Sequence, residues 1–250
     1  IGLDAVSLPL HPDFMETVNV SRAIVEADIV ISLPKFKTHG LTVMTGAIKN
    51  SYGILPGAQK ARLHKIAGNP SRFHDLVVEV FKLRVPDLFI VDAVVGMEGN
   101  GPASPELREI GLILAADNAV AIDAVMAAMM GLDPGRLRFL QNAADAGLGS
   151  WKMADIRIDG KLKKIKNFKL PPLGGEAIQD NAVVQEMLES KTRLTPRADP
   201  DGCTACGTCV EQCPAQALSM PNDLPQADMD LCVTCFCCQE VCPEKAMVLQ

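Results

Sequence analysis

The chain has 250 residues, of which 48% are hydrophobic and 22% charged, a composition that excludes a disordered or low-complexity chain. No apolar run approaches the ~20 residues that a membrane-spanning helix needs, and the first residues lack the pattern of a signal peptide, so we expect a cytoplasmic protein without membrane contact. Because the sequence starts at Ile1, inside an apolar segment, we expect that an N-terminal part precedes it.

Strands alternate with helices in the first part of the chain. A run rich in β-branched residues at 27–34 ends at a proline and predicts a buried strand, with a short helix before it at 22–27. The segment 70–84 starts with proline and serine and then carries apolar residues at helical spacing, which predicts a helix. Two further buried strands are expected at 87–97 and 109–117.

Two more helices are expected after these strands. One covers 118–131 and ends at Gly131, and the other covers 134–146. The alternation of strands and helices predicts an α/β layered domain with a largely parallel sheet.

The last fifty residues differ in composition from the rest. Residues 201–250 hold seven acids and one base, Lys245, whereas residues 1–200 hold 23 of each, so the formal charge of −6 lies in this final segment. All nine cysteines lie there as well. The two shifts place a domain boundary near residue 200.

The cysteines form two copies of the pattern C-x2-C-x2-C-x3-C-P, the second 29 residues after the first. The first copy comprises Cys203, Cys206, Cys209 and Cys213, and the second comprises Cys232, Cys235, Cys238 and Cys242. Three thiolates at this spacing wrap one face of an iron–sulfur cubane, and the fourth ligand comes from elsewhere. Disulfides require a secretory context, and zinc sites usually pair two separated C-x2-C units, so the pattern favours iron–sulfur clusters.

This segment resembles the bacterial two-cluster ferredoxins. The resemblance implies a small α+β ferredoxin-like domain with two [4Fe–4S] clusters that exchange ligands, so that the fourth cysteine of each copy binds the other cluster. Its acidic surface suits a redox partner protein with a basic face. The ninth cysteine, Cys237, is interpreted as a small apolar filler.

The predicted organisation therefore has three parts. These are an α/β domain at 1–175, a linker at 176–200 that contains a helix at 177–190, and the two-cluster domain at 201–250.

The segment from Ile29 to His74 is basic and free of carboxylates. These 46 residues contain no Asp or Glu. They contain Lys35, Lys37, Lys49, Lys60, Arg62, Lys65 and Arg72, with His39, His64 and His74. The body of the chain is net neutral and the segment has few aromatic residues, which argues against nucleic acid and favours a small anionic ligand.

Two predicted strands end next to polar and glycine-rich loops. The first leads into Lys35, Lys37 and His39, and the second carries Asp92 and leads into a turn with Glu98 and Asn100. In open α/β sheets, ligands bind beyond the carboxyl ends of the strands, so we expect an anionic small molecule there.

The segments 27–64, 90–102 and 111–131 resemble the DUF362 family, whose members often carry a C-terminal ferredoxin module. The resemblance implies a longer N-terminal part. Family members commonly continue the 90–102 segment with a glycine-proline-arginine element. This element is absent here, and its absence weakens any role that the resemblance would assign to Arg108.

A more distant likeness concerns the nickel-pincer lactate racemases. In that family a histidine, a lysine ten residues later and a second histidine serve as acid/base, cofactor tether and nickel ligand. Here His39, Lys49 and His64 have this spacing, so the likeness implies these roles for them. Asn50 and Ser51 depart from the racemase pattern, and the electron-transfer module is an addition.

We expect an iron–sulfur redox protein of the oxidoreductase type that passes electrons from two clusters to an anionic substrate or cofactor. His39 is the expected proton donor, titrating in the physiological range, with Glu98 as its alternative. The candidate catalytic residues are His39, Lys49 and Glu98, and the candidate binding residues are Lys35, Lys37, Asn50, His64, Asp92 and Asn100. A non-enzymatic carrier that docks a partner, and a nickel enzyme, remain as alternatives.

Overall fold

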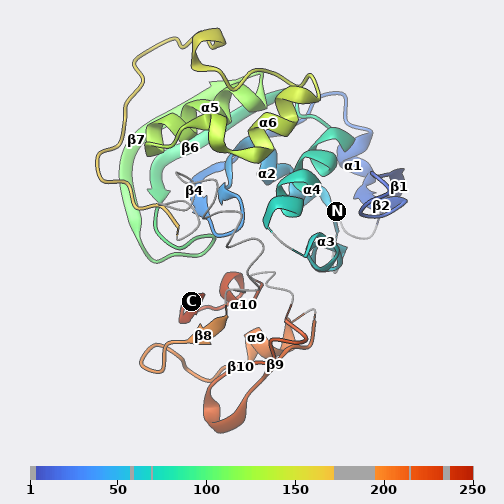
Figure 1. The fold of residues 1–250 in the computed structure, drawn as a ribbon, viewed down its shortest axis with the longest axis vertical. Helices are drawn as coiled ribbons and strands as arrows, with labels where there is room; N and C mark the ends of the chain where they lie inside the picture. Colours follow the sequence, from blue (N-terminus) through green and yellow to red (C-terminus); the bar gives the residue numbers. More distant parts are fainter. Residues whose placement is uncertain are drawn as a thin grey trace.

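The computed structural model describes residues 4–56, 59–68, 70–171, 195–213, 215–232 and 237–249. Figure 1 shows an α/β domain, formed by the residues up to 171, and a small domain formed by those from 195 onward. The predicted helix at 177–190 lies outside the described residues.

The α/β domain is built on a mixed five-stranded sheet in the order β3-β6-β4-β5, with β7 on β6. The strands are β3 (Ile31–Ser32), β4 (Lys35–His39), β5 (Val43–Met44), β6 (Leu88–Met97) and β7 (Leu107–Ala116). The first two pair with β6 in parallel, whereas β7 on β6 and β5 on β4 are antiparallel. The expected α/β architecture is confirmed. Parallel pairs are present, but the longest pairing is antiparallel because β7 follows β6 through a short turn rather than through a helix.

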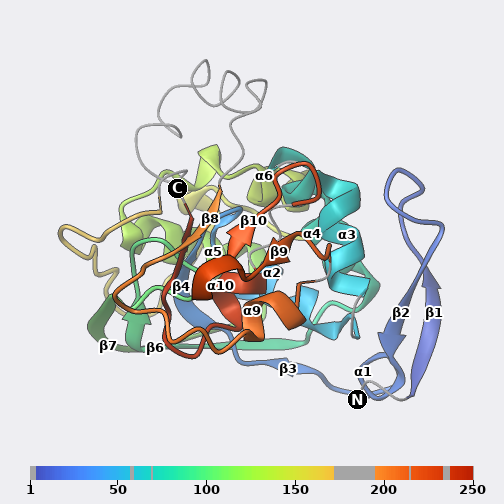
Figure 2. The ribbon, with the colours of Figure 1, turned by 90° about the horizontal axis from the view of Figure 1, so that it is seen from below.

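The helices that follow β4 lie on one side of the sheet, as Figure 2 shows. They are α2 (Gly46–Asn50), α3 (Gln59–Ala67), α4 (Pro70–Leu83), α5 (Ala119–Met130) and α6 (Arg138–Asp145), with 3-10 turns at Ser51–Ile54, Pro134–Arg136 and Met153–Asp155. The one-turn helix α1 (Arg22–Val25) lies instead beside residues 17–21, which precede it. The inward side chains of β6, Phe89, Val91 and Ala93, are fully buried against these helices. The core of the domain lies between these two layers.

The predicted helices at 70–84 and 118–131 are confirmed with small shifts at their ends. The Asn118 side chain accepts a hydrogen bond from the Ala121 N–H and caps α5, and Gly131 ends the helix at φ 87°. The predicted helix at 134–146 is a 3-10 turn followed by α6.

The prediction of buried strands is wrong for one face of the sheet. Ile31 and Leu33 are 52% and 69% exposed, and Val94 and Ile113 are 49% and 67% exposed. These side chains lie on the face opposite the helices, which the described residues leave uncovered. The first strand is also shorter than the predicted 27–34, because only Ile31–Ser32 of that run pairs with β6.

An N-terminal hairpin was not expected from the sequence. Strands β1 (Ala5–Pro9) and β2 (Thr17–Ser21) pair antiparallel and project from one side of the domain (Figure 2).

The described residues of the small domain form two short antiparallel ladders, two one-turn helices and a 3-10 turn at Pro221–Asp223, which confirms the expected α+β module. Strand β8 (Pro196–Ala198) pairs with β11 (Met247–Leu249), and β9 (Leu218–Ser219) pairs with β10 (Gln226–Ala227). The helices are α9 (Thr208–Glu211) and α10 (Cys237–Glu240). Because β8 belongs to this module, the small domain begins before residue 201 and includes the end of the predicted linker.

Candidate functional site

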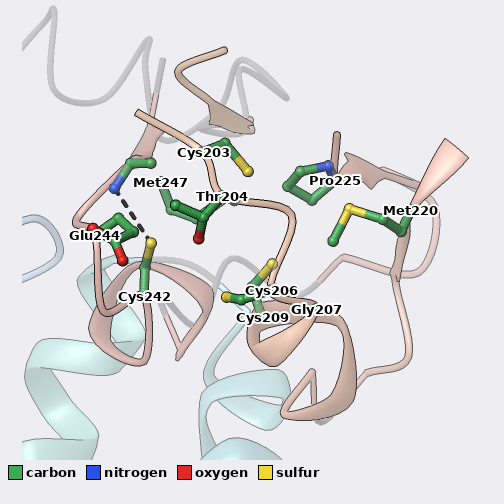
Figure 3. A pocket seen from close by; sticks show the side chains of 11 residues that line it. Cys203, Thr204, Cys206, Gly207, Cys209, Met220, Pro225, Cys242, Glu244 and Met247 are labelled. Atoms are coloured by element: carbon green, nitrogen blue, oxygen red, sulfur yellow. Dashed lines mark hydrogen bonds between the residues drawn. The ribbon is translucent and has the colours of Figure 1, made fainter. Parts of the chain in front are cut away.

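Four cysteines of the small domain surround one hollow. Cys203, Cys206 and Cys209 from the first copy of the motif line it together with Cys242 from the second, as Figure 3 shows. The hollow has a volume of about 320 Å³, including the solvent at its mouth, and Met220, Pro225, Ala246 and Met247 contribute apolar walls. The distribution over the two copies has the pattern in which the fourth cysteine comes from the other repeat.

The other cysteines of the motifs are described in part. Cys213, Cys232 and Cys238 are half-buried, and Cys235 lies outside the described residues. The sulfur of Cys213 accepts a hydrogen bond from the Ala217 N–H at 3.3 Å, and that of Cys242 accepts one from the Ala246 N–H at the same distance. The two repeats therefore place the same N–H···S contact after their last cysteine.

The thiols of the hollow differ in electrostatic environment. Hydrogen bonding to Thr208 lowers the pKa of the exposed Cys206 thiol, whereas burial raises the pKa of Cys209. Within the described ranges, no three His, Cys, Asp or Glu side chains are placed to hold a single metal ion. The four cysteines instead share one hollow from two motifs, and a set of four thiolates is the donor set of an iron–sulfur cluster.

His39 lies at the end of β4 and is buried, with 2% of its surface exposed. Its Nδ1 atom accepts hydrogen bonds from the N–H groups of Leu41 and Thr42 at 3.1 and 3.3 Å. Two N–H donors on one ring nitrogen require that nitrogen to be unprotonated, so the proton of the neutral ring is on Nε2. The ring stacks on Phe73 at a centroid distance of 6.4 Å.

His64 packs on the same phenylalanine, at 4.4 Å between ring centroids. Its Nδ1–H donates to the Lys60 carbonyl at 2.7 Å, which leaves the lone pair on Nε2. The Tyr52 ring packs edge-on against His64 at 5.2 Å. The two histidines thus belong to one aromatic cluster around Phe73.

The histidines of this cluster are neutral at pH 7. Burial and then the charge of Lys49 lower the pKa of His39 well below its usual range, with smaller contributions from His64, Lys37 and His74. Burial also lowers the pKa of His64 to about 4. The expectation that His39 titrates in the physiological range is therefore wrong for the protein as it stands, because desolvation and neighbouring cations disfavour its charged form.

Lys49 and His64 both lower the pKa of His39, and Lys49 also lowers that of His64, so the three side chains lie near one another. Lys37 belongs to the same group and donates to the Pro102 carbonyl at 3.2 Å. We call these four residues the histidine–lysine cluster.

Asp123 positions the turn that carries Lys49. This carboxylate on α5 is fully buried and accepts hydrogen bonds from the N–H groups of Ala47 and Ile48, at 2.5 and 3.0 Å, at the start of α2. Burial raises the pKa of Asp123 to about 7. Gly46 has φ 57°, and a Cβ there would clash with the carboxylate, so glycine is required at this contact. Sequence reasoning missed Asp123, although a lone carboxylate in the apolar run of α5 was a visible signal.

Lys35 and Asp92 are not part of the histidine–lysine cluster. They form an ion pair at 2.7 Å on the uncovered face of the sheet, where both side chains are about half exposed. Their opposite positions in the register between β4 and β6 explain the pairing. Asn50 donates to the Ser32 hydroxyl at 3.1 Å. The structure therefore shows ordinary structural contacts for these three predicted binding residues.

Glu98 is held by Arg108, with N···O distances of 2.9 and 3.0 Å, and it accepts the Lys169 N–H at 3.2 Å. The carboxylate is 4% exposed. A buried carboxylate with these partners is a structural ion pair, so the proposal of Glu98 as an alternative proton donor is not supported, and Arg108 has a clear role in holding it.

Asn100 lies where the two domains meet. Its carbonyl oxygen accepts a hydrogen bond at 3.2 Å from the side chain of Gln239 on α10, and Gln239 is 3% exposed. Figure 1 shows α10 at the end of the small domain that lies nearest the α/β domain. The next residue, Gly101, accepts the N–H of Gly40 at 3.0 Å, directly after His39. The Asn100 turn thus links α10 to the end of β4.

Two families match this chain. The family described as "Domain of unknown function (DUF362)" matches residues 2–128, and the family described as "4Fe-4S dicluster domain" matches residues 195–243. A protein of Synechocystis sp. named "Thylakoid-associated protein sll1697" is 40% identical over 123 residues, which are 49% of this chain and 38% of that protein. The aligned part is thus well under half the length of this relative.

These comparisons bear out two of the three likenesses drawn from the sequence. The DUF362 and two-cluster likenesses are confirmed, whereas the likeness to the lactate racemases is not shown by them. Among the described helices, none combines the length and the apolar character needed to cross a membrane.

Proposed function

The chain belongs to the DUF362 family and carries a 4Fe-4S dicluster domain, and on this premise we propose that it is an iron–sulfur electron-transfer protein that serves an anionic substrate or cofactor in its α/β domain. When bound, the clusters supply one-electron transfer.

We assign one [4Fe–4S] cluster to Cys203, Cys206, Cys209 and Cys242, whose convergence on one hollow supports the assignment. The remaining motif cysteines, Cys213, Cys232, Cys235 and Cys238, are assigned to the second cluster by the same exchange of ligands. Hydrogen bonds to sulfur and apolar surroundings are the means by which a protein sets a cluster's reduction potential, and this chain supplies both around its cysteines.

The contact between Gln239 and Asn100 carries the proposal. Gln239 follows the cluster ligand Cys238 directly, and the turn it binds is hydrogen-bonded to Gly40, the neighbour of His39. Covalent and hydrogen bonds therefore connect a cluster ligand with the histidine–lysine cluster. A module that only carried electrons past the α/β domain would have no need of this attachment.

The positive charge of the histidine–lysine cluster favours the binding of an anion. The four groups that act on the pKa of His39 are all cationic when protonated, and two of them are lysines. A bound anion would offset this charge. An anion would also raise the pKa of His39, which would allow it to act as a proton donor only when the ligand is present.

A carrier without chemistry of its own is the second candidate. The 2% exposure of His39 favours it, because a ligand needs a route to this ring. In this case the acidic small domain would exchange electrons between partner proteins, and the α/β domain would serve as a docking body.

The first experiment is the metal content of anaerobically purified protein. We expect about eight irons and no nickel per chain, with an unmodified mass for the peptide that contains Lys49. About four irons would contradict the two-cluster assignment. Stoichiometric nickel with added mass on Lys49 would favour a racemase-like centre instead.

The second experiment tests the anion site by chemical labelling of lysines. Acetic anhydride is applied with and without pyrophosphate or oxalate as probe anions, and the labelled peptides are weighed. We expect at least one anion to lower the labelling of Lys49 several-fold and to leave Lys82, which is paired with Glu79 on α4, unchanged. Equal labelling of Lys49 under all conditions in iron-loaded protein would favour the carrier.

A further inference from the structure

We propose that the two halves of the small domain have different roles: the first half forms a docking surface for a basic electron-transfer protein, and the second half attaches the domain to the α/β domain. The inference rests on the proposed function, because such a surface is useful only if the cysteines hold clusters.

The duplication allows the two halves to be compared position by position, at an offset of 29 residues. The turn before the first motif is closed by the Asp201 N–H, which donates to the Asp199 carboxylate at 3.1 Å. The turn before the second motif is closed in the same way by Asp230 and Asp228, at 2.9 Å. The two halves therefore share one framework, and differences between equivalent side chains are meaningful.

The helices α9 and α10 carry different side chains at one equivalent position. Val210 on α9 packs, half-buried, against the small core of its own domain. Its equivalent on α10 is Gln239, which is buried and donates to the Asn100 carbonyl. A polar amide in place of valine is explained by this bond, since a buried amide without a partner is destabilising. The second half is thus adapted to attachment.

The first half of the small domain presents exposed residues around its cysteines. Thr204 and Cys206 are exposed and border the hollow that we assign to the first cluster, and Ala205 between them is exposed as well. The acidic rim consists of Glu244, which is exposed and lines the hollow (Figure 3), and of the exposed Asp201, which lies two residues before Cys203. Asp201 has an exposed equivalent in Asp230, whereas the position equivalent to Glu244 is Ala215, so Glu244 is the acid that distinguishes the first hollow.

The negative charge of this surface favours a partner protein with a positively charged face. Residues 201–250 hold seven acids against one base, so a partner with a positive face gains both long-range attraction and orientation. An exposed cysteine loop at the centre of the acidic rim brings the first cluster close to the surface of such a partner, which favours transfer of single electrons between them.

Ferricytochrome c, a basic one-electron acceptor, is the probe for this surface. The clusters are first reduced with dithionite, and the excess reductant is removed. One electron then leaves the reduced small domain and converts the ferric haem to the ferrous form, and the rate is followed by stopped-flow absorption at low ionic strength. Asp201→Lys is compared with Asp230→Lys, its equivalent in the second half. Both variants change the charge by two units, and neither side chain takes part in the turn hydrogen bonds.

We expect Asp201→Lys to slow the reaction roughly fivefold, as two unit charges at ~8 Å in water would do, and Asp230→Lys to have a much smaller effect. The difference should vanish at high salt, where exposed charges are screened. Equal slowing by the two variants, or greater slowing by Asp230→Lys, would overturn the proposal. Unchanged cluster absorption in both variants shows that the domain remains folded.

Binding is measured independently by NMR of the labelled protein. Added ferrous cytochrome c, which accepts no electron, should shift the amide signals of Thr204 and Ala205 and leave those of Asn100 and Gly101 unchanged. Shifts centred on Asn100 would contradict the assignment of the two halves. If the protein contains no iron and no variant reduces cytochrome c, the proposed function itself fails; if it contains eight irons and the variants are equal, only this inference fails.

Discussion

The two domains are held together in different ways. The α/β domain has a continuous apolar core between the sheet and its helices, which includes the fully buried rings of Phe36, Phe81, Phe89 and Phe139. In the small domain, the buried cluster consists of Cys209, Leu218 and Met247, and the described strands have two or three residues each. A module of this size buries too little apolar surface to fold firmly, so its stability must come mainly from metal–thiolate bonds.

This comparison also explains where charge and polar contacts are tolerated. The α/β domain buries a carboxylate, Asp123, and three neutral histidines, and it positions them with backbone hydrogen bonds. In the small domain, the acidic side chains that the structure describes are exposed. This difference agrees with the proposal that one domain holds a ligand and the other exchanges electrons with a partner.

Removal of iron should have the largest effect, and it should affect one domain only. Chelation after oxidation is expected to abolish the ordered NMR signals of Leu218 and Met247, because the ligand bonds supply the folding free energy of the small domain. The α/β domain should keep its thermal unfolding midpoint, reported by the fluorescence of Trp151, the single tryptophan, which packs on its core.

Two cysteine variants provide the matched control. Cys209→Ser should lose iron in the same way, whereas Cys237→Ser, at a spacer position within the second motif, should keep it. Loss of the α/β domain together with the iron would show that the domains do not have separate sources of stability.

Truncation of a core ring should destabilise the α/β domain and leave the clusters intact. Phe89 on β6 is fully buried and contacts Phe81 at 6.3 Å between ring centroids. Phe89→Ala is expected to lower the free energy of unfolding by about 3–5 kcal/mol, measured by denaturant titration of Trp151 fluorescence. Ile113→Ala, on the uncovered face of the sheet, is the control and should cost less than about 1 kcal/mol. Comparable losses would mean that the uncovered face is buried in solution.

Asp123→Asn should change the pH dependence of stability in the α/β domain. The folded-state pKa of Asp123 is raised from 3.8 to about 7, so between these values the folded protein binds a proton that the unfolded chain has released. The free energy of unfolding therefore falls as pH rises through this window, by up to about 1.4 kcal/mol per pH unit.

The measurement is the difference in stability between wild type and Asp123→Asn at pH values from 4 to 8. The difference isolates this carboxylate, because the histidines are present in both proteins and their contributions cancel. On their own they have the opposite slope, since their lowered pKa values make stability fall as pH drops below about 6.5. Asp145→Asn, at an exposed position on α6, serves as the control. A constant difference at all pH values would show that Asp123 does not titrate in the folded protein.

The smallest effect is expected for the ion pair of Lys35 and Asp92. Both side chains are about half exposed, and water and salt screen such pairs. Asp92→Asn should therefore cause no measurable change in the thermal unfolding midpoint or in cluster absorption. A loss of stability close to that of Phe89→Ala would indicate that another part of the protein covers this face.

Local sequence patterns were sufficient for much of the fold. Helix α5 was predictable because an apolar run ends at a glycine that takes a left-handed conformation, and the cysteine motifs were predictable because cluster ligation requires this spacing. The uncovered face of the sheet was not predictable, since an apolar run such as 27–34 does not reveal whether one face or two are covered.

The candidate site was predictable only where residues lie close in sequence. His39, Lys49 and His64 come together because one short segment turns back on itself. Glu98 and Arg108, or Lys35 and Asp92, pair across strands, and this depends on a register that composition does not encode. Gln239 became recognisable only when its position was compared with Val210 in the folded repeats.

The measurement that tests this account most directly is the paramagnetic relaxation of backbone amide protons in anaerobic, isotope-labelled protein. If α10 rests on the Asn100 turn, the amides of Asn100, Gly101 and Gly40 should relax much faster than those of the β1–β2 hairpin, because bound clusters enhance relaxation steeply with proximity. Gln239→Ala should weaken this effect, and Val210→Ala should preserve it. Uniform relaxation across the α/β domain in the iron-loaded protein would contradict the attachment of the clusters to this site.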